Sequence, residues 1–389
     1  MNEYYTSILR ALKANNLYRR LRDVKVINSS KAIVDGKEVI LLCSNDYLGL
    51  SCSKEVRESM LTYLNNTFSI SQCSSRLMAG NDPLLNELEY ELALHKRKDK
   101  ALLYANGYMA NLALASLFDE NTIVYSDELN HASIIDACRL GKARVKVFKH
   151  NSIDELKHIL NEDKDKSSKI KVIVTEGVFS MDGDIAMLDE ISSLSREHNA
   201  MLVVDDAHGD FIYGSNYRGI AEYLNVEDSV DVITSSLSKG LGCFGGYTVS
   251  NECIIDYLVN KARSFIYTSA LPSIFAVAAL RALSVVKQGI MQSRLFANVK
   301  LFRERLLSMG FNTQSNTHII PVIVGDEKRA LEFTNSLLEH GVFTQAIRYP
   351  TVAKGKARIR VTLTALHTRE DIEHALEIFR HVGKDLALI

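Results

Sequence analysis

The sequence predicts an α/β protein with a mainly parallel central sheet covered by helices and a smaller α+β domain at the C-terminal end. Short, continuously apolar runs alternate with segments of helical spacing in the middle of the chain. Such runs are typical of parallel strands buried on both faces. A change of pattern after about residue 275 predicts the second domain.

The expected elements follow one another with short connections. Ser152 and Glu155 have the spacing of a helix start and predict a helix from residue 152 onward. Further along, the predicted elements are strands at 171–179 and 200–208 with a helix at 187–199 between them, a strand at 230–234, a long helix at 274–288, and strands at 318–326 and 356–365. We therefore expect an N-terminal segment at 1–44, a large domain at 45–275 and a small domain at 276–389.

Composition argues against several classes of function. The chain has 389 residues with 46 basic and 47 acidic side chains, so its net charge of -1 gives no reason to expect nucleic acid as a partner. No apolar run approaches the roughly 20 residues that span a membrane, and the first residues lack a signal-peptide core. The six cysteines form no CxxC pair, which indicates reduced thiols, a cytoplasmic location and no metal site.

One lysine stands in an unusual setting. Lys239 lies in the glycine-rich stretch 235–247, "SSLSKGLGCFGGY", which lacks the GxxxxGK[ST] spacing of a nucleotide phosphate loop. It follows an expected strand, as do Ser180 and Ser236, and Asp205 and His208 lie at the end of another. Ligands of open α/β sheets bind beyond the carboxyl ends of the strands. These side chains therefore predict a site at that edge.

A lysine amine in such a site indicates Schiff-base chemistry, for which pyridoxal phosphate is the commonest cofactor. Asp205 suits the pyridine nitrogen, His208 the ring oxygen, and His131 the face of the ring. Two groups of donors could bind the phosphate. The first is the N–H groups of Gly107, Tyr108 and Met109 at a predicted helix start, and the second is the hydroxyl of Ser236, three residues before the lysine.

Each residue also has an ordinary structural interpretation. An aspartate that ends a strand is most often a cap or turn residue, and a single histidine is more often structural than catalytic. Residues 107–111 could simply begin a helix. Arg358 and Arg360 alternate with apolar residues along an expected strand, where one of them could form a solvent-facing ion pair.

Seven motifs in this order resemble the α-oxoamine synthases, which condense an amino acid with an acyl thioester and release carbon dioxide. The resemblance runs from about residue 17 to the C-terminus and implies a fold-type I pyridoxal-phosphate transferase. The motifs are "NDYLGL" (45–50), "SSRLMAGN" (74–81), "LNHASIIDACRL" (129–140), "GVFSMDGDIAML" (177–188), "VVDDAHG" (203–209), "SLSKGLGCFGGY" (236–247) and "IRYPTVAKGKARIRVTLTALHT" (347–368).

The resemblance implies a role for each matching residue. Lys239 would form the Schiff base and remove the α-proton, assisted by Asp205, His208 and His131, with Ser180 close to the cofactor. The implied phosphate ligands are Gly107, Tyr108, Ser236 and, from the neighbouring subunit of a homodimer with shared active sites, Thr268.

The motifs "CSNDYLGL", "DDAHGD" and "TLTALHT" most resemble the family member that uses L-alanine and a pimeloyl thioester in biotin synthesis. Asn45 and Arg360 match substrate-binding positions, with Arg360 on the amino-acid carboxylate. Arg19 matches the position that binds the far carboxylate of the pimeloyl chain, although it could equally belong to a solvated basic helix. The pimeloyl group would arrive on coenzyme A or on an acyl carrier protein.

Four positions depart from the family pattern. Ser71, Cys73 and Phe211 stand where glycine is usual, and Leu85 where histidine is frequent. None is an expected cofactor ligand, so the departures bear on the acyl tunnel rather than on the chemistry. The alternative functions are glycine acyltransfer, giving 2-amino-3-oxobutyrate or 5-aminolevulinate, and a non-catalytic partner subunit. A non-catalytic subunit typically lacks the Schiff-base lysine, which is present here.

Overall fold

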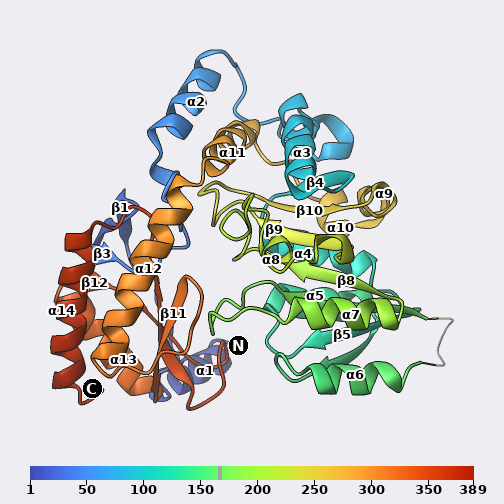
Figure 1. Ribbon diagram of the computed structural model, residues 1–389. Coiled ribbons are helices and arrows are strands. Elements are labelled where there is room, and N and C mark those ends of the chain that lie inside the picture. The colour runs from blue at the N-terminus through green and yellow to red at the C-terminus, as the bar shows by residue number, and fades with distance from the viewer. Residues whose placement is uncertain (165–168) are drawn as a thin grey trace. The chain divides into compact units, whose positions relative to one another are not determined.

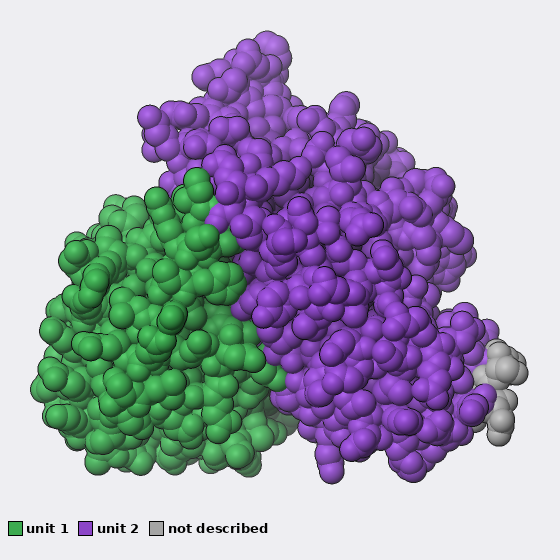
Figure 2. All heavy atoms as spheres, viewed as in Figure 1, with its two compact units in different colours: residues 1–49, 181–184, 290–389 green, residues 50–180, 185–289 purple. Residues whose placement is uncertain are grey.

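The computed structural model describes residues 1–164 and 169–389. The chain forms two compact units, which Figure 2 shows in different colours. One consists of Met1–Gly49, Met181–Asp184 and Ile290–Ile389, and the other of Leu50–Ser180 and Ile185–Gly289. The larger unit is thus nearly continuous in sequence, whereas the smaller one joins three stretches of chain.

The larger unit is built on a seven-stranded sheet with the order β4-β10-β9-β8-β7-β5-β6 (Figure 1). Its strands from β6 to β9 run parallel, which confirms the predicted mainly parallel sheet, whereas β10 is antiparallel to β9 and β4. β10 runs antiparallel to β9 because the loop between them is short, whereas a crossover to a parallel strand needs about a dozen residues or more. The strands are β4 (Lys100–Tyr104), β5 (Thr122–Asp127), β6 (Arg144–Phe148), β7 (Ile170–Glu176), β8 (Ala200–Asp205), β9 (Val232–Ser236) and β10 (Gly246–Ser250).

Every residue of β5, β9 and β10 is buried, because helices cover both faces of this sheet. On one face Val124, Val174 and Val203 pack against Ile134 and Ala137 of α5. The helices of this unit are α2 (Lys54–Asn65), α3 (Pro83–Lys96), α4 (Gly107–Ala113), α5 (Ala132–Gly141), α6 (Ile153–Asn161), α7 (Leu188–Glu197), α8 (Ile220–Tyr223), α9 (Glu252–Lys261), α10 (Arg263–Ile266) and α11 (Ser273–Val286).

The expected elements of the central region are confirmed within a few residues. The predicted strands at 171–179 and 200–208 are β7 and β8, and the helix between them is α7. Ser152 caps α6 by accepting a hydrogen bond from the N–H of Glu155 at 3.4 Å. The Glu155 carboxylate instead accepts from the N–H of Lys149, so the cap is one-sided.

The smaller unit contains two sheets, with the orders β1-β2-β3-β12 and β11-β14-β13. The N-terminal residues belong here because β3 pairs with β12 in parallel, with Ile40 opposite Val342. Its elements are α1 (Asn2–Ala14), β1 (Val24–Asn28), β2 (Lys31–Val34), β3 (Lys37–Leu41), α12 (Ile290–Ser308), β11 (Ile319–Gly325), α13 (Glu327–Glu339), β12 (Val342–Phe343), β13 (Gln345–Ile347), β14 (Ala357–Thr362) and α14 (Arg369–Asp385).

The units divide the chain at different places from the domains expected from the sequence. Residues 1–44 are not a unit of their own, because β3 adds to the sheet that β12 completes. The smaller unit resumes at Ile290 rather than at residue 276, since α11 packs against α2 and α3 of the larger unit.

In the described part of the chain, no single helix has the length and apolar composition needed to cross a membrane. The consecutive helices α11 and α12 meet that criterion only when taken together across a bend.

Candidate active site

A cavity of about 240 Å³ lies in the larger unit, at the carboxyl ends of its parallel strands. Its wall includes Glu176, Asp205 and Ser236, which are the last residues of β7, β8 and β9. Lys239 lies in the loop after β9, and Gly107 begins α4 on another side. The sheet therefore brings together residues that are far apart in sequence.

Lys239 and His208 are direct neighbours in this pocket. Lys239 Nζ lies 2.9 Å from His208 Nε2, and both residues form part of the pocket wall. His208 is buried, in the loop that follows β8. The structure thus places the amine beside a ring nitrogen with which it shares a hydrogen bond.

The glycines after Lys239 allow backbone segments to approach closely. A Cβ atom on Gly246 would lie 2.4 Å from the carbonyl carbon and oxygen of Asn106. Gly245 has a φ of +132°, a conformation that side chains other than hydrogen rarely allow. The glycines therefore bring the strand that follows the lysine loop against the start of α4.

Hydroxyl and backbone groups gather beside the first turn of α4. Ser236 Oγ lies 2.7 Å from Ser238 Oγ, and a Cβ atom on Gly107 would meet the Ser236 Cβ at 3.0 Å. Gly107 and Tyr108 line the pocket together with these serines. Hydroxyl groups and the N–H groups of a helix start are suited to bind an anion.

Two carboxyl groups end neighbouring strands at this site. Glu176 and Asp205 pair in register and are both buried. Burial raises the pKa of Glu176 well above its ordinary value, and the negative charge of Asp205 raises it further. Burial and the neighbouring charge of Asp205 thus both favour the protonated form of Glu176.

His131 lies at the start of α5 and lines the same pocket. Its Nδ1 lies 2.7 Å from Ser133 Oγ, and its ring meets that of Tyr108 edge to face at 6.2 Å. Burial lowers the pKa of His131, with a smaller effect in the same direction from Lys239, while Asp205 opposes it. Burial therefore favours the neutral form of the imidazole.

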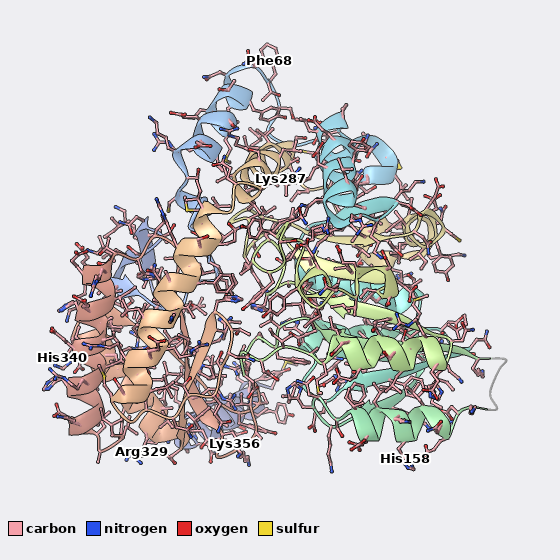
Figure 3. The ribbon with its side chains drawn as sticks, viewed as in Figure 1. Phe68, His158, Lys287, Arg329, His340 and Lys356 are labelled. Atoms are coloured by element: carbon pink, nitrogen blue, oxygen red, sulfur yellow. The ribbon has the colours of Figure 1, made fainter. Side chains whose placement is uncertain are left out.

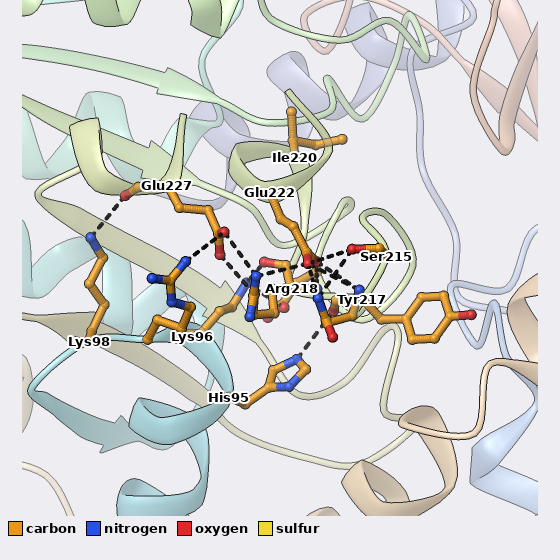
Figure 4. Close-up of polar contacts among 12 residues, drawn as sticks. His95, Lys96, Lys98, Ser215, Tyr217, Arg218, Ile220, Glu222 and Glu227 are labelled. Carbon is orange, nitrogen blue, oxygen red and sulfur yellow. Dashed lines mark hydrogen bonds and ion pairs between the residues drawn. The ribbon is translucent and has the colours of Figure 1, made fainter. Parts of the chain in front are cut away.

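A buried ion cluster anchors the loop that carries His208. Lys96 Nζ lies 2.5 Å from Asp210 Oδ1 and 3.6 Å from Asp206 Oδ2. It also donates to the carbonyl oxygen of Arg218 at 2.6 Å, in a region where Glu222 accepts further hydrogen bonds (Figure 4). This ammonium group thus ties residues 206–210 to residue 218.

In the smaller unit, Arg360 of β14 is buried beside two polar side chains. Its Nη1 donates to Asn45 Oδ1 at 3.0 Å and its Nη2 to the Tyr47 hydroxyl at 3.1 Å. Arg358 on the same strand is also buried and forms an ion pair with Asp182. Both arginine side chains are therefore buried, and neither faces solvent as the alternative interpretation of this strand would require.

The sequence from residue 37 to residue 379 matches the profile of the family described as aminotransferase class I and II. That match covers well over half of the chain.

The chain belongs to the aminotransferase class I and II family.

Curated relatives in this family extend over nearly the whole chain. The chain is 41% identical to the 8-amino-7-oxononanoate synthase of Thermoanaerobacter pseudethanolicus over 384 residues, which is 98% of this chain and 97% of the relative. It is 42% identical to the enzyme of that name from Thermosipho melanesiensis over 97% of each chain. The predicted resemblance to α-oxoamine synthases is thereby confirmed.

Solved structures confirm the predicted fold-type I transferase fold. Serine palmitoyltransferase from Sphingomonas wittichii has a TM-score of 0.93 at 30% identity, covering 99% of this chain and 98% of the other. The S. paucimobilis enzyme, with pyridoxal phosphate and myriocin bound, has a TM-score of 0.93 at 28% identity and the same coverage.

The pocket residues of this family member fit pyridoxal phosphate by their chemistry. Lys239 offers an amine for a Schiff base, and Asp205 offers a carboxylate for a ring nitrogen. The start of α4 with Ser236 offers N–H and hydroxyl donors for a phosphate. A single pocket of the larger unit thus holds all three kinds of group.

Four residues expected at the site lie elsewhere or make other contacts. Ser180 and Met109 are not part of the described wall of the pocket. Ser180 is half-buried in the loop after β7, and the N–H of Met109 donates to Asn106 Oδ1 at 3.0 Å. Met109 and Thr268 line a second cavity of about 620 Å³ in the same unit. Arg19, in the smaller unit, is exposed and donates to Thr351 Oγ1 at 3.3 Å.

The four departures from the family pattern have different settings. Phe211 is fully buried at a φ of +66°, the conformation that favours glycine, and stacks on His95. Leu85 is buried in α3. Ser71 and Cys73 lie in the segment between α2 and the 74–81 motif, where Cys73 also has a positive φ of 51°. None of the four lines the described part of the pocket.

The structure adds site residues that the sequence analysis did not single out. Glu176, Asn111, Ser133 and Ser238 line the pocket. Glu176 had a detectable signal, because it is a charged residue near the end of an expected strand, as Asp205 is. Asn111 and Ser133 had none, since a buried amide or hydroxyl on a helix has no distinctive spacing.

Proposed function

We propose that this chain is a pyridoxal-phosphate acyltransferase that converts L-alanine and a pimeloyl thioester to 8-amino-7-oxononanoate, carbon dioxide and a free thiol. A bond forms between the alanine Cα and the thioester carbonyl carbon, while the C–S bond and the bond to the alanine carboxylate break. The supporting observation is the pocket that joins Lys239, His208 and Asp205 in a chain 41% identical to 8-amino-7-oxononanoate synthase.

Pyridoxal phosphate, when bound, would supply an aldehyde that reacts with amines and a ring that accepts electrons from the substrate Cα. Lys239 Nζ supplies the resting amine and takes the Cα proton of alanine. Asp205 would hold a proton at the ring nitrogen through its charge, and His208 would donate to the ring oxygen. His131 would cover one face of the ring, with Ser180 nearby.

Gly107, Tyr108 and Ser236 hold the phosphate in this proposal, together with Thr268 of the partner subunit in a homodimer. Support comes from the position of Thr268, which lines the second cavity rather than the pocket of its own chain. Apolar side chains at the surface of the larger unit also favour association with a second copy. Phe68 is fully exposed in the loop after α2 (Figure 3), and Ile70, Met78 and Tyr267 are exposed as well.

Residues of the smaller unit bind the substrates. Arg360 meets the amino-acid carboxylate with a charge-assisted hydrogen bond, and Asn45 orients its guanidinium group. Arg19 binds the far carboxylate of the pimeloyl chain. The protein acts in the cytoplasm, and the acyl donor is pimeloyl-coenzyme A or a pimeloyl acyl carrier protein.

A substrate panel tests the assignment. Alanine, glycine and serine are each offered with pimeloyl, acetyl and palmitoyl thioesters, and thiol release and product mass are measured. We expect alanine with the pimeloyl thioester to have the highest kcat/KM. A preference for glycine or for uncharged acyl chains would contradict the proposal.

Arginine variants test the acyl end of the same proposal. Removing Arg19 together with its neighbour Arg20 should raise KM for the pimeloyl thioester by about 10- to 150-fold, since a charge-assisted pair contributes roughly 1.5–3 kcal/mol. An uncharged thioester of similar length is the control and should change little. Equal effects on both thioesters would remove Arg19 from the acyl site.

A further inference from the structure

A chain of hydrogen bonds behind the pocket joins two residues of the candidate site. Asn111 in α4 is buried, and its Nδ2 donates to Asp205 Oδ2 at 2.6 Å and to Ser133 Oγ at 2.9 Å. Its Oδ1 accepts from Thr234 Oγ1 at 2.6 Å. Ser133 Oγ continues the chain to His131 Nδ1 at 2.7 Å. One amide therefore contacts Asp205 directly and His131 through a serine.

Donor and acceptor rules give this chain one direction. An ionised carboxylate only accepts hydrogen bonds, so the Asn111 atom that faces Asp205 must be the amide nitrogen. Its two hydrogens are then used by Asp205 and Ser133, and Thr234 must donate to the amide oxygen. Because Ser133 Oγ accepts from Asn111, its own hydrogen is available for His131 Nδ1.

A second hydrogen bond also makes His131 Nδ1 an acceptor, because the backbone N–H of Ser133 donates to it at 3.3 Å. Nδ1 is thus an acceptor, and in the neutral imidazole the proton lies on Nε2.

We propose that Asn111 and Thr234 are positioning residues that orient Asp205 and, through Ser133, fix His131 in the Nε2–H tautomer. The step that concerns the bound cofactor rests on the proposed function. Thr234 is the more telling of the two, because it is buried in β9 and does not belong to the described wall of the pocket. Any effect of Thr234 on the cofactor must pass through Asn111 or the backbone.

Replacing Thr234 by valine keeps the shape but leaves Asn111 Oδ1 without its donor. An unsatisfied buried acceptor costs about 1–3 kcal/mol, which corresponds to about 5- to 150-fold in an equilibrium or rate. We expect kcat to fall within this range in Thr234→Val while KM for the acyl thioester stays near the wild-type value. The visible circular dichroism of bound pyridoxal phosphate should also weaken, because it reports how the ring is held.

Thr248→Val is the matched control. Thr248 lies directly opposite Thr234 on β10 and is equally buried, so this variant loses a threonine hydroxyl beside Thr234 without removing any hydrogen bond of the chain. Thr234→Ser retains the donor and should restore both kcat and the visible signal. If Thr234→Val and Thr248→Val behave alike, the positioning role is wrong. An inactive wild-type enzyme would instead contradict the proposed function.

A second measurement needs no turnover and does not depend on Thr234→Val folding. In ¹⁵N-histidine-labelled protein, two-bond ¹H–¹⁵N spectra distinguish the two neutral tautomers, and His131→Gln identifies the signal. We expect the Nε2–H form in the wild type and a mixture with the Nδ1–H form in Ser133→Ala. A wild-type His131 with its proton on Nδ1 would overturn the assignment.

Discussion

At the residue scale, the site depends on which of two neighbouring carboxyl groups, Glu176 or Asp205, carries the negative charge. Glu176 and Asp205 end adjacent strands, and burial keeps the pKa of Glu176 well above its usual range. Asp205 receives hydrogen bonds from the Asn111 amide and from the N–H of Ala207 at 3.0 Å. These donors stabilise a negative charge on Asp205 rather than on Glu176.

Asp205→Asn should therefore reduce turnover far more than cofactor binding. A neutral amide cannot hold a proton on the ring nitrogen, and we expect kcat to fall by at least about 100-fold, or roughly 2.7 kcal/mol of transition-state stabilisation. Steady-state kinetics and cofactor titration measure the two effects. Asp228→Asn, at an exposed aspartate, is the control. Near-normal turnover in Asp205→Asn would exclude the assigned role.

The sequence predicted the residues whose position follows from strand order. Lys239, Asp205 and Ser236 each follow or end a strand, and parallel strands bring such residues to one edge. Thr234 and Asn111 could not be predicted in the same way. Their role depends on side chains that meet only after β9 and α4 have packed together.

At the element scale, the loop after β8 depends on the buried ion cluster of Lys96, Asp206 and Asp210. Burial, with a smaller effect from the negative charge of Asp210, raises the pKa of Asp206 to about 7, although the positive charge of Lys96 opposes both. A folded-state pKa above the unfolded one stabilises the protein at low pH, and this contribution is lost as the pH rises toward about 7. The contribution of Asp206 to the free energy of unfolding is consequently largest below about pH 4 and is lost above about pH 7.

Asp206→Asn should flatten the pH dependence of stability between about pH 4 and about pH 7. The wild type should lose about 2–4 kcal/mol of unfolding free energy more than the variant over that interval. Urea unfolding at several pH values measures the difference. Glu176 affects the pH dependence of stability in the same direction in the wild type and in the variant, so the difference between the two proteins is due to Asp206. An unchanged pH slope in the variant, matching that of Asp228→Asn, would contradict this prediction.

Elements could be predicted where the periodicity is local, whereas the pairing of distant strands leaves no signal in the sequence. The helix α7 and the strands β7 and β8 are visible in the apolar pattern alone. The pairing of β3 with β12 is not, because nothing near Ile40 in the sequence specifies Val342 as its partner. The N-terminal segment was accordingly expected to be separate.

At the scale of the whole molecule, complementation between variants tests the shared site. Lys239→Ala and Thr268→Ala chains are mixed and refolded, and activity is measured at limiting pyridoxal phosphate. In a mixed dimer, one site would combine an intact Lys239 with the partner's intact Thr268, so activity should exceed that of either parent.

The control mixes Lys239→Ala with Ser236→Ala. Both of these residues line the pocket of one chain, so no intact site can form in the mixed dimer and no gain is expected. If mixed dimers form but the Thr268 pair also shows no gain, the site is not shared.

The parallel pairing of β3 with β12 also has a consequence during translation. β3 leaves the ribosome early, but its partner β12 follows about 300 residues later, a wait of about 15–60 s at 5–20 residues per second. The nearly continuous larger unit can be complete before then. The nascent chain therefore carries an unpaired strand edge at β3 through most of its synthesis, and this edge is where a chaperone or a neighbouring nascent chain would first bind.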